Sequence, residues 1–361
     1  MNYPLISVDI KEYKSYNIHI SLDIDFHKSI LSLSVNQKIL IVTSKRVSEL
    51  HLKYILDKLA FVGITPDIYI LEDGENYKTL ETSTQILSYL IEHKYDTKSI
   101  LVSLGGGVIS DLTGYVASIY KRGIKYINIP TTLLAQVDAS IGGKTGVNFK
   151  SYKNMIGSIY QPSEVLISSY FLQTLPLREF LSGMAEVIKY ACTFSKKFFN
   201  WLETNSQSIL DLDKNKILEL LYFCAQTKVD IISKDPNDNL GIRAVLNFGH
   251  TLGHAIESFN NYKYLHGECV SIGILLALKI SSLVNNFNTD KIEHIKNLFL
   301  KFGIALNLKT HMKVEDYIEK IIQDKKSVNN SINFILLKDI GNFEINPIDI
   351  TNISSILTQI L

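Results

Sequence analysis

The chain has 361 residues, of which 46% are apolar and 20% charged, and its formal net charge is +1. This composition is that of a soluble globular protein, and the length favours two domains of ordinary size. A nearly neutral chain has no global basic field, which argues against duplex nucleic acid as a partner. A phosphate-binding site would therefore have to come from a local cluster of Lys and Arg.

The cysteine pattern favours a reduced, cytoplasmic compartment. Cys192, Cys224 and Cys269 are far apart in the sequence, and no two of them form a C-x-x-C pair. The first twenty residues are interrupted by charges and lack the apolar core of a signal peptide. The longest apolar stretch, Cys269–Ile280, is too short to span a bilayer. We expect this stretch to be a buried helix, and we expect no membrane partner.

The first half of the chain alternates short apolar runs with segments of helical spacing. We predict buried strands at Lys38–Thr43, Asp67–Leu71, Ser99–Leu104 and Tyr126–Ile129. We predict helices at Val47–Leu59 and Thr82–Glu92. Strands and helices that alternate at this interval are typical of βαβ units, so the first half should form an α/β domain with a parallel sheet.

The second half is predicted to be mostly α-helical. Helical spacing extends over Leu177–Thr193, Lys196–Ser208, Lys214–Ile232, Ala244–Ser258, Glu268–Leu283 and Asp290–Phe302. Two prolines flank a short apolar run between Gln161 and Pro176, and we place the domain boundary there, at residue 170. Without a low-complexity linker, the two domains, 1–170 and 171–361, are expected to pack closely around the active site.

Two segments of the first domain could bind a nucleotide. Gly105–Gly107 follow a predicted strand and precede a probable helix, so backbone N–H groups could approach a pyrophosphate at the start of that helix. The spacing is not G-x-G-x-x-G, and a tight strand-to-helix turn explains it equally well. The acidic segment Asp73–Lys78 follows the second strand and could bind ribose hydroxyls, although such segments are more often polar turns.

A third group of polar residues surrounds a glycine pair. Asp138, Lys144, Lys153 and Asn154 fall within seventeen residues of otherwise neutral sequence. Gly142 and Gly143 before Lys144 would let the backbone approach a ligand closely, and the lysine offers a charge for phosphate. A solvated loop lysine is the ordinary alternative, but the density of polar groups favours a binding site.

The sequence predicts a metal centre in the second domain. Glu186 and Lys189 are three residues apart and share a helix face, although a surface salt bridge would have the same spacing. His250 and His254 are one helical turn apart, and His266 follows. Helical spacing alone pairs His250 with His254, whereas Glu186, His250 and His266 could supply the three mixed ligands of a catalytic zinc site.

The chain resembles the 3-dehydroquinate synthases, a family of sugar-phosphate cyclases. The matching runs occur in family order from about residue 40 to the end: DGENYK at 73–78, GGGVISD at 105–111, YKRGIKYINIPTTLLAQVDASIGGKTGV at 120–147, KNMIGSIYQP at 153–162, GMAEVIKY at 183–190, NFGHTLGHAIE at 247–257, LHGE at 265–268 and DKK at 324–326. A chance match over so many runs is not credible.

The resemblance implies a Rossmann-like NAD domain followed by a helical metal-binding domain. It implies a divalent metal, zinc or cobalt, on Glu186, His250 and His266. It implies NAD contacts from Asp73, Gly74, Glu75, Lys78, Gly107, Val108, Ile109, Ser110, Asp111, Thr131, Thr132, Lys144, Lys153, Phe171, Leu172, Gln173 and Thr174. It implies substrate or phosphate contacts from Asp138, Lys144, Asn154, Lys189, Lys228, Arg243, Asn247, His254 and Lys326, with Arg122 reaching in from a neighbouring subunit of a homodimer.

The implied activity belongs to the shikimate pathway, which leads to chorismate and the aromatic amino acids. It converts 3-deoxy-D-arabino-heptulosonate 7-phosphate to 3-dehydroquinate and phosphate, by transient oxidation with NAD, phosphate elimination, re-reduction and intramolecular aldol closure. A sister cyclase that makes an inosose or a valiolone is one alternative, although Arg243 and Lys326 favour an acid substrate. A polyol dehydrogenase of related fold and an inactive ligand-binding paralogue are the others.

Three positions depart from the family pattern. Ser110 stands where Gly is usual, and Ser44 stands where Asp is common after the first strand. Between Lys228 and Arg243 the chain is one residue longer than usual, so the expected acidic position falls on Asp238 or Asn239. None of these departures affects the proposed metal ligands or the phosphate-binding lysines.

Overall fold

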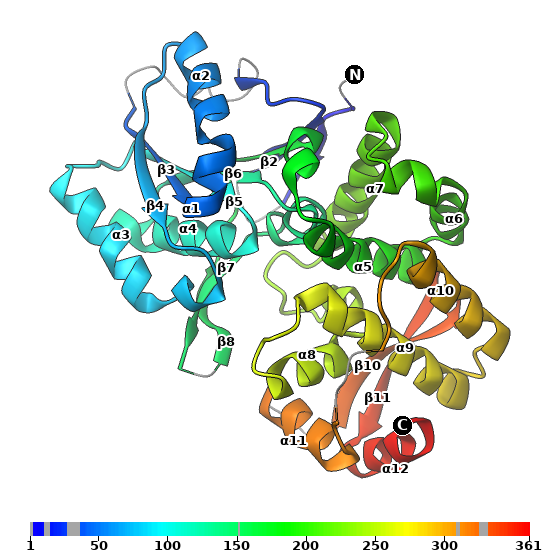
Figure 1. Cartoon of the computed structure of the whole chain (residues 1–361). Coiled ribbons are helices and arrows are strands. Elements are labelled where there is room, and N and C mark those ends of the chain that lie inside the picture. The colour runs from blue at the N-terminus through cyan, green and yellow to red at the C-terminus, as the bar shows by residue number, and fades with distance from the viewer. Residues whose placement is uncertain (1–2, 11–14, 27–36, 151, 308–310, 325–330) are drawn as a thin grey trace. The chain divides into compact units, whose positions relative to one another are not determined.

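The computed structural model describes residues 3–10, 15–26, 37–150, 152–307, 311–324 and 331–361. The chain divides into two compact units (Figure 1). The first contains the chain up to Pro176 together with Ile217–Asn237, and the second contains Leu177–Lys216 together with Asp238–Leu361. Helix α7 (Lys214–Ile232) therefore belongs mainly with the first unit, although it follows the first helices of the second unit in the chain.

The first unit is built on a seven-stranded sheet. Its order is β1 (Ile6–Val8), β2 (Tyr16–Ser21), β9 (Glu164–Ser168), β6 (Lys125–Pro130), β5 (Ile100–Gly105), β3 (Ile39–Ser44) and β4 (Asp67–Leu71). Only the β1–β2 pair is antiparallel among these neighbours. The α/β fold with a largely parallel sheet is therefore confirmed, as are the four predicted strands; β1, β2 and β9 were not predicted.

Alternate residues of the central strands face two different layers of helices. On β3, Ile39 and Ile41 pack in one apolar cluster with Ile55 and Leu59 of α2 (Lys53–Phe61). The intervening Leu40 and Val42 join a second cluster on the other face of the sheet. Because side chains alternate along a strand, a strand covered on both faces must be apolar throughout, and this explains the uninterrupted run at 39–42.

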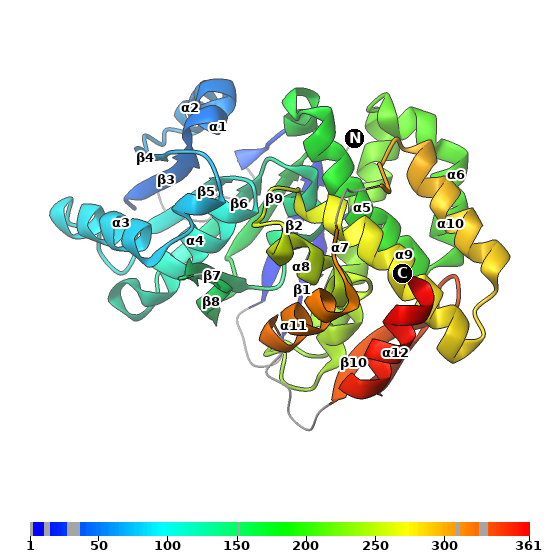
Figure 2. The same ribbon diagram turned by 60° about the horizontal axis from the view of Figure 1, so that its bottom comes forward.

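Two helices supply the second layer, α3 (Leu80–Glu92) and α4 (Gly107–Ile119). Figure 2 shows α3 and α4 side by side. The α3 helix contributes Ile86 and Leu90 to the second apolar cluster, and α4 contributes Leu112 and Val116. Shorter elements complete this unit: α1 (Lys45–Val47), a π-helical turn (Ser48–Leu52), and the 3-10 or π turns Glu75–Tyr77, Tyr120–Arg122, Ala135–Ala139 and Ser169–Thr174. The helix predicted at Val47–Leu59 is thus formed by three successive helical segments.

A separate hairpin, β7 (Lys144–Phe149) with β8 (Tyr152–Ile159), packs against α4. Glycines make this close approach possible. A Cβ atom on Gly114 of α4 would lie 2.4 Å from the Thr145 side chain. Within the hairpin, a Cβ atom on Gly157 of β8 would lie 2.1 Å from the Thr145 carbonyl oxygen of β7. The hairpin, which sequence periodicity did not predict, carries Lys144, Lys153 and Asn154.

The second unit is mostly helical. Its helices are α5 (Leu177–Phe194), α6 (Lys196–Leu210), α8 (His250–Phe259), α9 (His266–Asn285), α10 (Thr289–Lys301), α11 (Val314–Asp324) and α12 (Ile350–Ile360). Helix α9 is long and apolar enough to cross a membrane by length and composition. However, 61% of its most apolar window is buried inside the protein, as in the core helix of a soluble domain. The expected buried helix at Cys269–Ile280 is therefore present.

Two features of this unit differ from the sequence-based expectation. The single helix predicted at Ala244–Ser258 is wrong, because a 3-10 turn (Ile242–Asn247) and α8 are separated at Gly249, whose φ is +78°. A left-handed residue cannot continue an α-helix, and glycine adopts that conformation at little cost. An antiparallel hairpin, β10 (Ser331–Asp339) with β11 (Asn342–Asp349), was not predicted and packs on α9.

Candidate active site

The predicted NAD-binding residues other than Lys144 and Lys153, which are on the β7–β8 hairpin, follow the carboxyl ends of strands of the parallel sheet. Asp73–Lys78 follow β4, Gly107–Asp111 open α4 after β5, Thr131 and Thr132 follow β6, and Phe171–Thr174 follow β9. Because these strands are parallel, their carboxyl ends meet at the same edge. In the sheet, β3 lies between β4 on one side and β5 on the other, so the order in which strands are added reverses beside β3. Open α/β sheets bind ligands at such a reversal.

The glycine turn after β5 fits a pyrophosphate group. Gly106 precedes α4 as its N-cap residue, and the first N–H groups of a helix have no partner within the helix. A Cβ atom on Gly106 would lie 3.1 Å from the Thr132 side chain, so only glycine keeps this backbone open to a ligand without displacing its neighbour. Ser110, which departs from the family pattern, is buried within the first turn of α4, where its N–H bonds Gly106 O at 3.1 Å.

A buried lysine, itself one of the predicted residues, contacts two others in the first unit. Lys78 is 4% exposed, and its Nζ atom donates to Asp111 Oδ2 at 2.5 Å and to the amide oxygen of Asn154. Burial raises the pKa of Asp111, and the Lys78 ammonium opposes that rise. The structure thus brings together Lys78 and Asp111, assigned to NAD, and Asn154, assigned to the substrate.

A second ion pair joins Lys228 of α7 to Asp138. The Lys228 ammonium donates to the Asp138 backbone oxygen at 2.6 Å and also to its carboxylate. These residues are 90 positions apart in the sequence. The pair is one of the contacts that attach Ile217–Asn237 to the first unit, and both residues were predicted to contact the substrate.

Other predicted substrate-binding residues lie on elements apart from these two ion pairs. Lys144 is exposed at the start of β7, and Arg122 is exposed in the turn after α4 with a left-handed φ of +67°. Arg243 and Asn247 lie in the 3-10 turn before α8, in the second unit. Lys326 lies outside the described residues.

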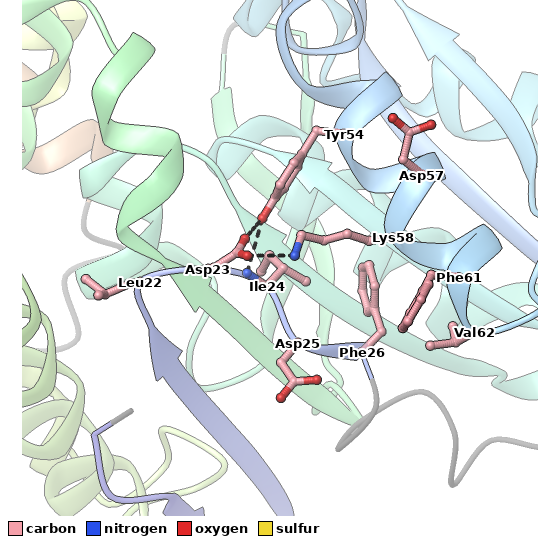
Figure 3. Close-up of a pocket in the computed structure, with 10 residues that line it drawn as sticks. All are labelled: Leu22, Asp23, Ile24, Asp25, Phe26, Tyr54, Asp57, Lys58, Phe61 and Val62. Atoms are coloured by element: carbon pink, nitrogen blue, oxygen red, sulfur yellow. Dashed lines mark hydrogen bonds and ion pairs between the residues drawn. The ribbon is translucent and has the colours of Figure 1, made fainter. Parts of the chain in front are cut away.

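A cavity of about 620 Å³ beside α2 is distinct from these groups (Figure 3). Tyr54 and Lys58 both reach the carboxylate of Asp23 there, with a Lys58 Nζ–Asp23 Oδ2 distance of 2.7 Å. The other lining residues are Leu22, Ile24, Asp25, Phe26, Asp57, Phe61 and Val62. None of the lining residues identified in the described chain was predicted to act in catalysis or binding.

The predicted metal centre is assembled within the second unit. Glu186 of α5 is completely buried, and its Oε1 atom lies 3.4 Å from Nε2 of His250 and 3.4 Å from Nε2 of His266. The Lys189 ammonium forms an ion pair with the other carboxylate oxygen, Oε2. In the described chain, neither oxygen of Glu186 has a hydrogen-bond partner of good geometry. The Glu186 carboxylate and the two imidazoles at which it directs one oxygen together form a suitable donor set for a cation.

The spacing of these donor atoms fits a tetrahedral metal. Zinc binds nitrogen and oxygen at about 2.0–2.2 Å, which makes the edge of a regular tetrahedron about 3.3–3.6 Å long. The two measured nitrogen–oxygen distances of 3.4 Å lie in this range. His254 is close as well, because ligand atoms of His250, His254 and His266 all lie within 4.8 Å of one another. The geometry therefore offers four candidate ligands, the predicted three and His254.

The outer nitrogen of each predicted histidine ligand faces an acceptor. Nδ1 of His250 lies 3.2 Å from the backbone oxygen of Phe248, and Nδ1 of His266 lies 3.3 Å from Oε2 of Glu257. A proton on each Nδ1 leaves the Nε2 lone pair directed at the site of the metal. Such outer hydrogen bonds fix the tautomer and ring orientation of metal-binding histidines.

The electrostatics of the centre favour positive charge. Burial lowers the pKa of His250 to about 3, so this imidazole is neutral at pH 7 and can act as a ligand. Burial would also lower the pKa of His266, but the carboxylates of Glu186 and Glu257, one near each ring nitrogen, raise it to about 10. Burial alone would raise the pKa of Glu186, yet Lys189 and the two imidazoles hold it well below its usual range. Two carboxylates therefore stabilise a proton or a divalent cation at His266.

Sequence reasoning did not single out Glu257. This side chain is 5% exposed and lies seven residues after His250 on α8. Two helical turns bring positions i and i+7 to one face, so the spacing from His250 was a usable signal. Glu268 was also missed: it accepts a bidentate pair of bonds from Arg178 at 2.7 and 2.8 Å and one from Leu265 N at 2.8 Å, and so holds the start of α9 where His266 stands.

Comparison with known families gives two adjacent matches. The model of the 3-dehydroquinate synthase N-terminal region matches residues 68–182, and that of the 3-dehydroquinate synthase C-terminal region matches residues 183–327. A 3-dehydroquinate synthase of Thermodesulfovibrio yellowstonii is 44% identical over 318 residues, which cover 88% of this chain and 88% of the relative. The similarity therefore extends through both units.

Solved structures share the fold over nearly the whole chain. A 2-epi-5-epi-valiolone synthase from Streptomyces hygroscopicus, with NAD+ and Zn2+ bound, has a TM-score of 0.88 at 23% identity and covers 98% of each chain. A 2-deoxy-scyllo-inosose synthase, complexed with carbaglucose-6-phosphate, NAD+ and Co2+, has a TM-score of 0.84 at 22% identity and covers 99% of this chain and 100% of its own. At these identities the similarity establishes the fold alone.

Proposed function

The chain belongs to the 3-dehydroquinate synthase family, and we propose that the residues described above convert 3-deoxy-D-arabino-heptulosonate 7-phosphate to 3-dehydroquinate and phosphate. This reaction places the enzyme in the shikimate pathway of aromatic amino acid biosynthesis. The geometric observation that carries the proposal is Oε1 of buried Glu186 at 3.4 Å from Nε2 of both His250 and His266. A relative that carries the name 3-dehydroquinate synthase is 44% identical to this chain, which favours this activity over that of a sister cyclase or a polyol dehydrogenase.

We assign the divalent metal, zinc or cobalt, to Glu186, His250 and His266. The proposal leaves His254 to contact the substrate, because the Glu186 carboxylate and the Nε2 atoms of His250 and His266 already provide the three ligands of a catalytic site with an open position. NAD is assigned to the edge of the sheet formed by the glycine turn of α4, Asp73–Lys78, Thr131–Thr132 and Phe171–Thr174. When bound, NAD supplies a reversible hydride acceptor and the metal supplies a Lewis acid for a substrate oxygen.

The side chains contribute mainly by holding the substrate and its phosphate. Lys144, Asn154, His254 and Arg122 of a second subunit are proposed to bind the phosphate group. Arg243 and Lys326 are proposed to bind the carboxylate end of the substrate. The substrate phosphate can itself remove the proton during elimination, so the reaction does not require a separate pair of catalytic carboxylates. Positioning of this kind can contribute on the order of 7–11 kcal/mol to lowering the barrier.

Phosphate release tests this proposal directly. The purified protein is incubated with the heptulosonate phosphate, catalytic NAD, and either zinc or cobalt, and then again after treatment with a chelator. We expect phosphate release that depends on metal and NAD, with no accumulation of NADH, since the hydride is returned in each turnover. Absence of release in metal-replete protein would contradict the synthase assignment, and release that persists after complete metal removal would contradict the metal site.

We also propose that the enzyme acts as a cytoplasmic homodimer. Arg122 is exposed on a turn in which Lys121, Arg122 and Gly123 all have positive φ, a strained conformation of the kind found at functional sites. Cys192, Cys224 and Cys269 are buried and lie far apart in the sequence, a pattern that supports a reducing compartment. Mixing an inactive Arg122→Ala variant with an inactive His266→Ala variant should restore part of the activity if the arginine acts across subunits. No recovery in mixed dimers would contradict this role.

A further inference from the structure

The hairpin that carries Lys153 and Asn154 contains an irregularity at Asn148. Val147 pairs with Ile156, but Phe149 pairs with Tyr152, so the one residue between them on β7 faces three residues on β8. Asn148 therefore has no partner in the β7–β8 ladder. Irregularities of this type redirect side chains and are frequent beside active sites. Here the extra residues of β8, Lys153 to Met155, include two predicted ligand contacts.

Asn148 instead bonds to the acidic segment after β4. Its backbone N–H donates to the backbone oxygen of Lys78 at 2.8 Å, and it forms a parallel bridge with Thr79. Its side-chain amide Nδ2 donates to Oε1 of Glu75 at 2.8 Å. Its amide oxygen accepts a hydrogen bond from the backbone N–H of Asn154 at 2.9 Å. One half-buried residue thus uses its backbone N–H, its amide nitrogen and its amide oxygen to join the two segments.

The bond to Asn154 has a consequence for the buried lysine. Asn154 has a left-handed φ of +50°, a conformation that asparagine tolerates better than most residues. In this conformation its side-chain oxygen accepts from Nζ of Lys78. Asn148 therefore contacts both members of this pair. Its backbone N–H bonds the backbone oxygen of Lys78, and its amide oxygen accepts from the backbone N–H of Asn154. The side chains of Lys78 and Asn154 bond to each other.

We propose that Asn148 is a positioning residue that couples the binding of NAD to the binding of the substrate phosphate. Lys78 and Glu75 belong to the proposed NAD site and Asn154 to the proposed phosphate site, so the inference rests on the function proposed above. When NAD orders the segment with Glu75 and Lys78, the bonds of Asn148 reduce the conformational freedom of Asn154. When phosphate orders Asn154, the same bonds reduce the freedom of that segment. Such coupling is reciprocal: each ligand must tighten the binding of the other by the same factor.

The role of Asn148 can be tested by reversing the direction of its side-chain hydrogen bond to Glu75. Asn148→Asp keeps an acceptor for the N–H of Asn154 but places a carboxylate against Glu75. Adding Glu75→Gln supplies an amide donor, so the bond between positions 75 and 148 can re-form in the opposite direction at unchanged net charge. Asn148→Ala removes both side-chain bonds. Asn346→Asp, in a pair with Asn285 in the other unit, controls for the exchange of an amide for a carboxylate.

The measurement is the dissociation constant of NAD from zinc-loaded protein, by titration calorimetry, without and with saturating inorganic phosphate. In the wild type and in Asn346→Asp we expect phosphate to tighten NAD binding by at least about 5-fold, the lower end of typical coupling. Asn148→Ala and Asn148→Asp should reduce this factor towards 1, and Asn148→Asp/Glu75→Gln should recover most of it. A role confined to stability would lower the melting temperature without changing the factor.

The outcomes separate this inference from the proposed function. If the wild type catalyses phosphate release but its coupling factor is 1, or if Asn148→Ala retains the full factor, the role of Asn148 is overturned while the synthase assignment stands. Failure of the double variant to recover coupling lost in Asn148→Asp would overturn the contribution of the Glu75 bond. If the wild type neither binds NAD nor releases phosphate, the proposed function fails and this inference fails with it.

Discussion

Buried Glu257 and half-buried His266 form a pair in which a carboxylate oxygen of α8 lies 3.3 Å from Nδ1 of the imidazole that begins α9. The same ring directs its other nitrogen, Nε2, at Glu186. The ring is therefore held between two carboxylates, one on each nitrogen. In the proposed metal centre the inner carboxylate is a ligand and the outer one orients the histidine.

Replacing the outer carboxylate should weaken metal binding. In Glu257→Gln the side chain is a poorer acceptor for Nδ1–H, and the loss of such an outer partner typically lowers metal affinity by about 10–100-fold. Competition with a chromophoric chelator would measure the zinc affinity. Glu203→Gln is the matched control, because Glu203 also contacts a histidine, His294, in an exposed pair. Equal zinc affinities of Glu257→Gln and the wild type would contradict the orienting role.

The two histidines that could complete the metal site should behave differently when removed. His266→Ala is expected to lose bound metal and metal-dependent activity, since it deletes a proposed ligand. His254→Ala should retain one metal per chain but raise the KM for the phosphorylated substrate. Metal content by atomic emission and steady-state kinetics distinguish the two cases. Retention of metal by His266→Ala together with its loss from His254→Ala would replace the proposed set with one that includes His254.

The glycine that separates the 3-10 turn from α8 should be intolerant of substitution. Gly249 has a φ of +78°, and a Cβ atom there would lie 2.5 Å from Cγ1 of Ile274. Gly241 has a similar φ of +75°, but nothing lies within 4 Å of its Cβ position. Gly241→Ala should cost about 1–2 kcal/mol for the left-handed backbone. Gly249→Ala should cost about 1–3 kcal/mol more because of overpacking.

Urea unfolding monitored by circular dichroism would measure this difference for the second unit. A shift of the midpoint that is equal in the two variants would show that the neighbouring side chain of Ile274 moves away at little cost. Because His250 follows Gly249 directly, Gly249→Ala should also reduce zinc affinity, whereas Gly241→Ala should leave it close to that of the wild type.

The buried imidazole of His51 should make the first unit sensitive to acid. His51 is 3% exposed, bonds Thr174 Oγ1 through Nε2 at 2.9 Å, and packs edge-on against Phe171. Burial lowers its pKa below the usual value of 6.5. As the pH falls below 6.5 the unfolded chain takes up a proton first, so stability is lost until the pH reaches the lowered pKa of the folded state.

One proton changes the free energy of unfolding by at most about 1.4 kcal/mol per pH unit. The loss of stability between pH 7 and pH 5.5 should therefore be smaller in His51→Gln, which does not titrate in this range. His93→Gln, at an exposed histidine, is the control. Stability measured by denaturant unfolding at both pH values checks this, and identical pH dependence in His51→Gln and the wild type would contradict it.

The i, i+4 spacing of His250 and His254 predicted two rings on one face of a helix, and their centroids are indeed 5.3 Å apart. Periodicity could not select between His254 and Glu186 as partners of His266, because Glu186 is on another helix 64 residues or more from both. Packing of α5 against α9, which involves residues distant in sequence, brings Glu186 to the histidines.

Sequence patterns alone were enough to predict the α/β character of the first unit, four of its parallel strands, the helical second unit and the family of the chain. These features depend on local patterns, namely uninterrupted apolar runs, helical periodicity and glycine-rich motifs, which are read over fewer than about twenty residues. Three features became visible only in the folded chain: α7 joins the first unit through Lys228 and Asp138, Glu257 supports His266, and Asn148 joins Glu75 to Asn154. Each of these depends on contacts between segments distant in sequence or on a local break in a strand pairing, and neither leaves a periodic signal in the chain.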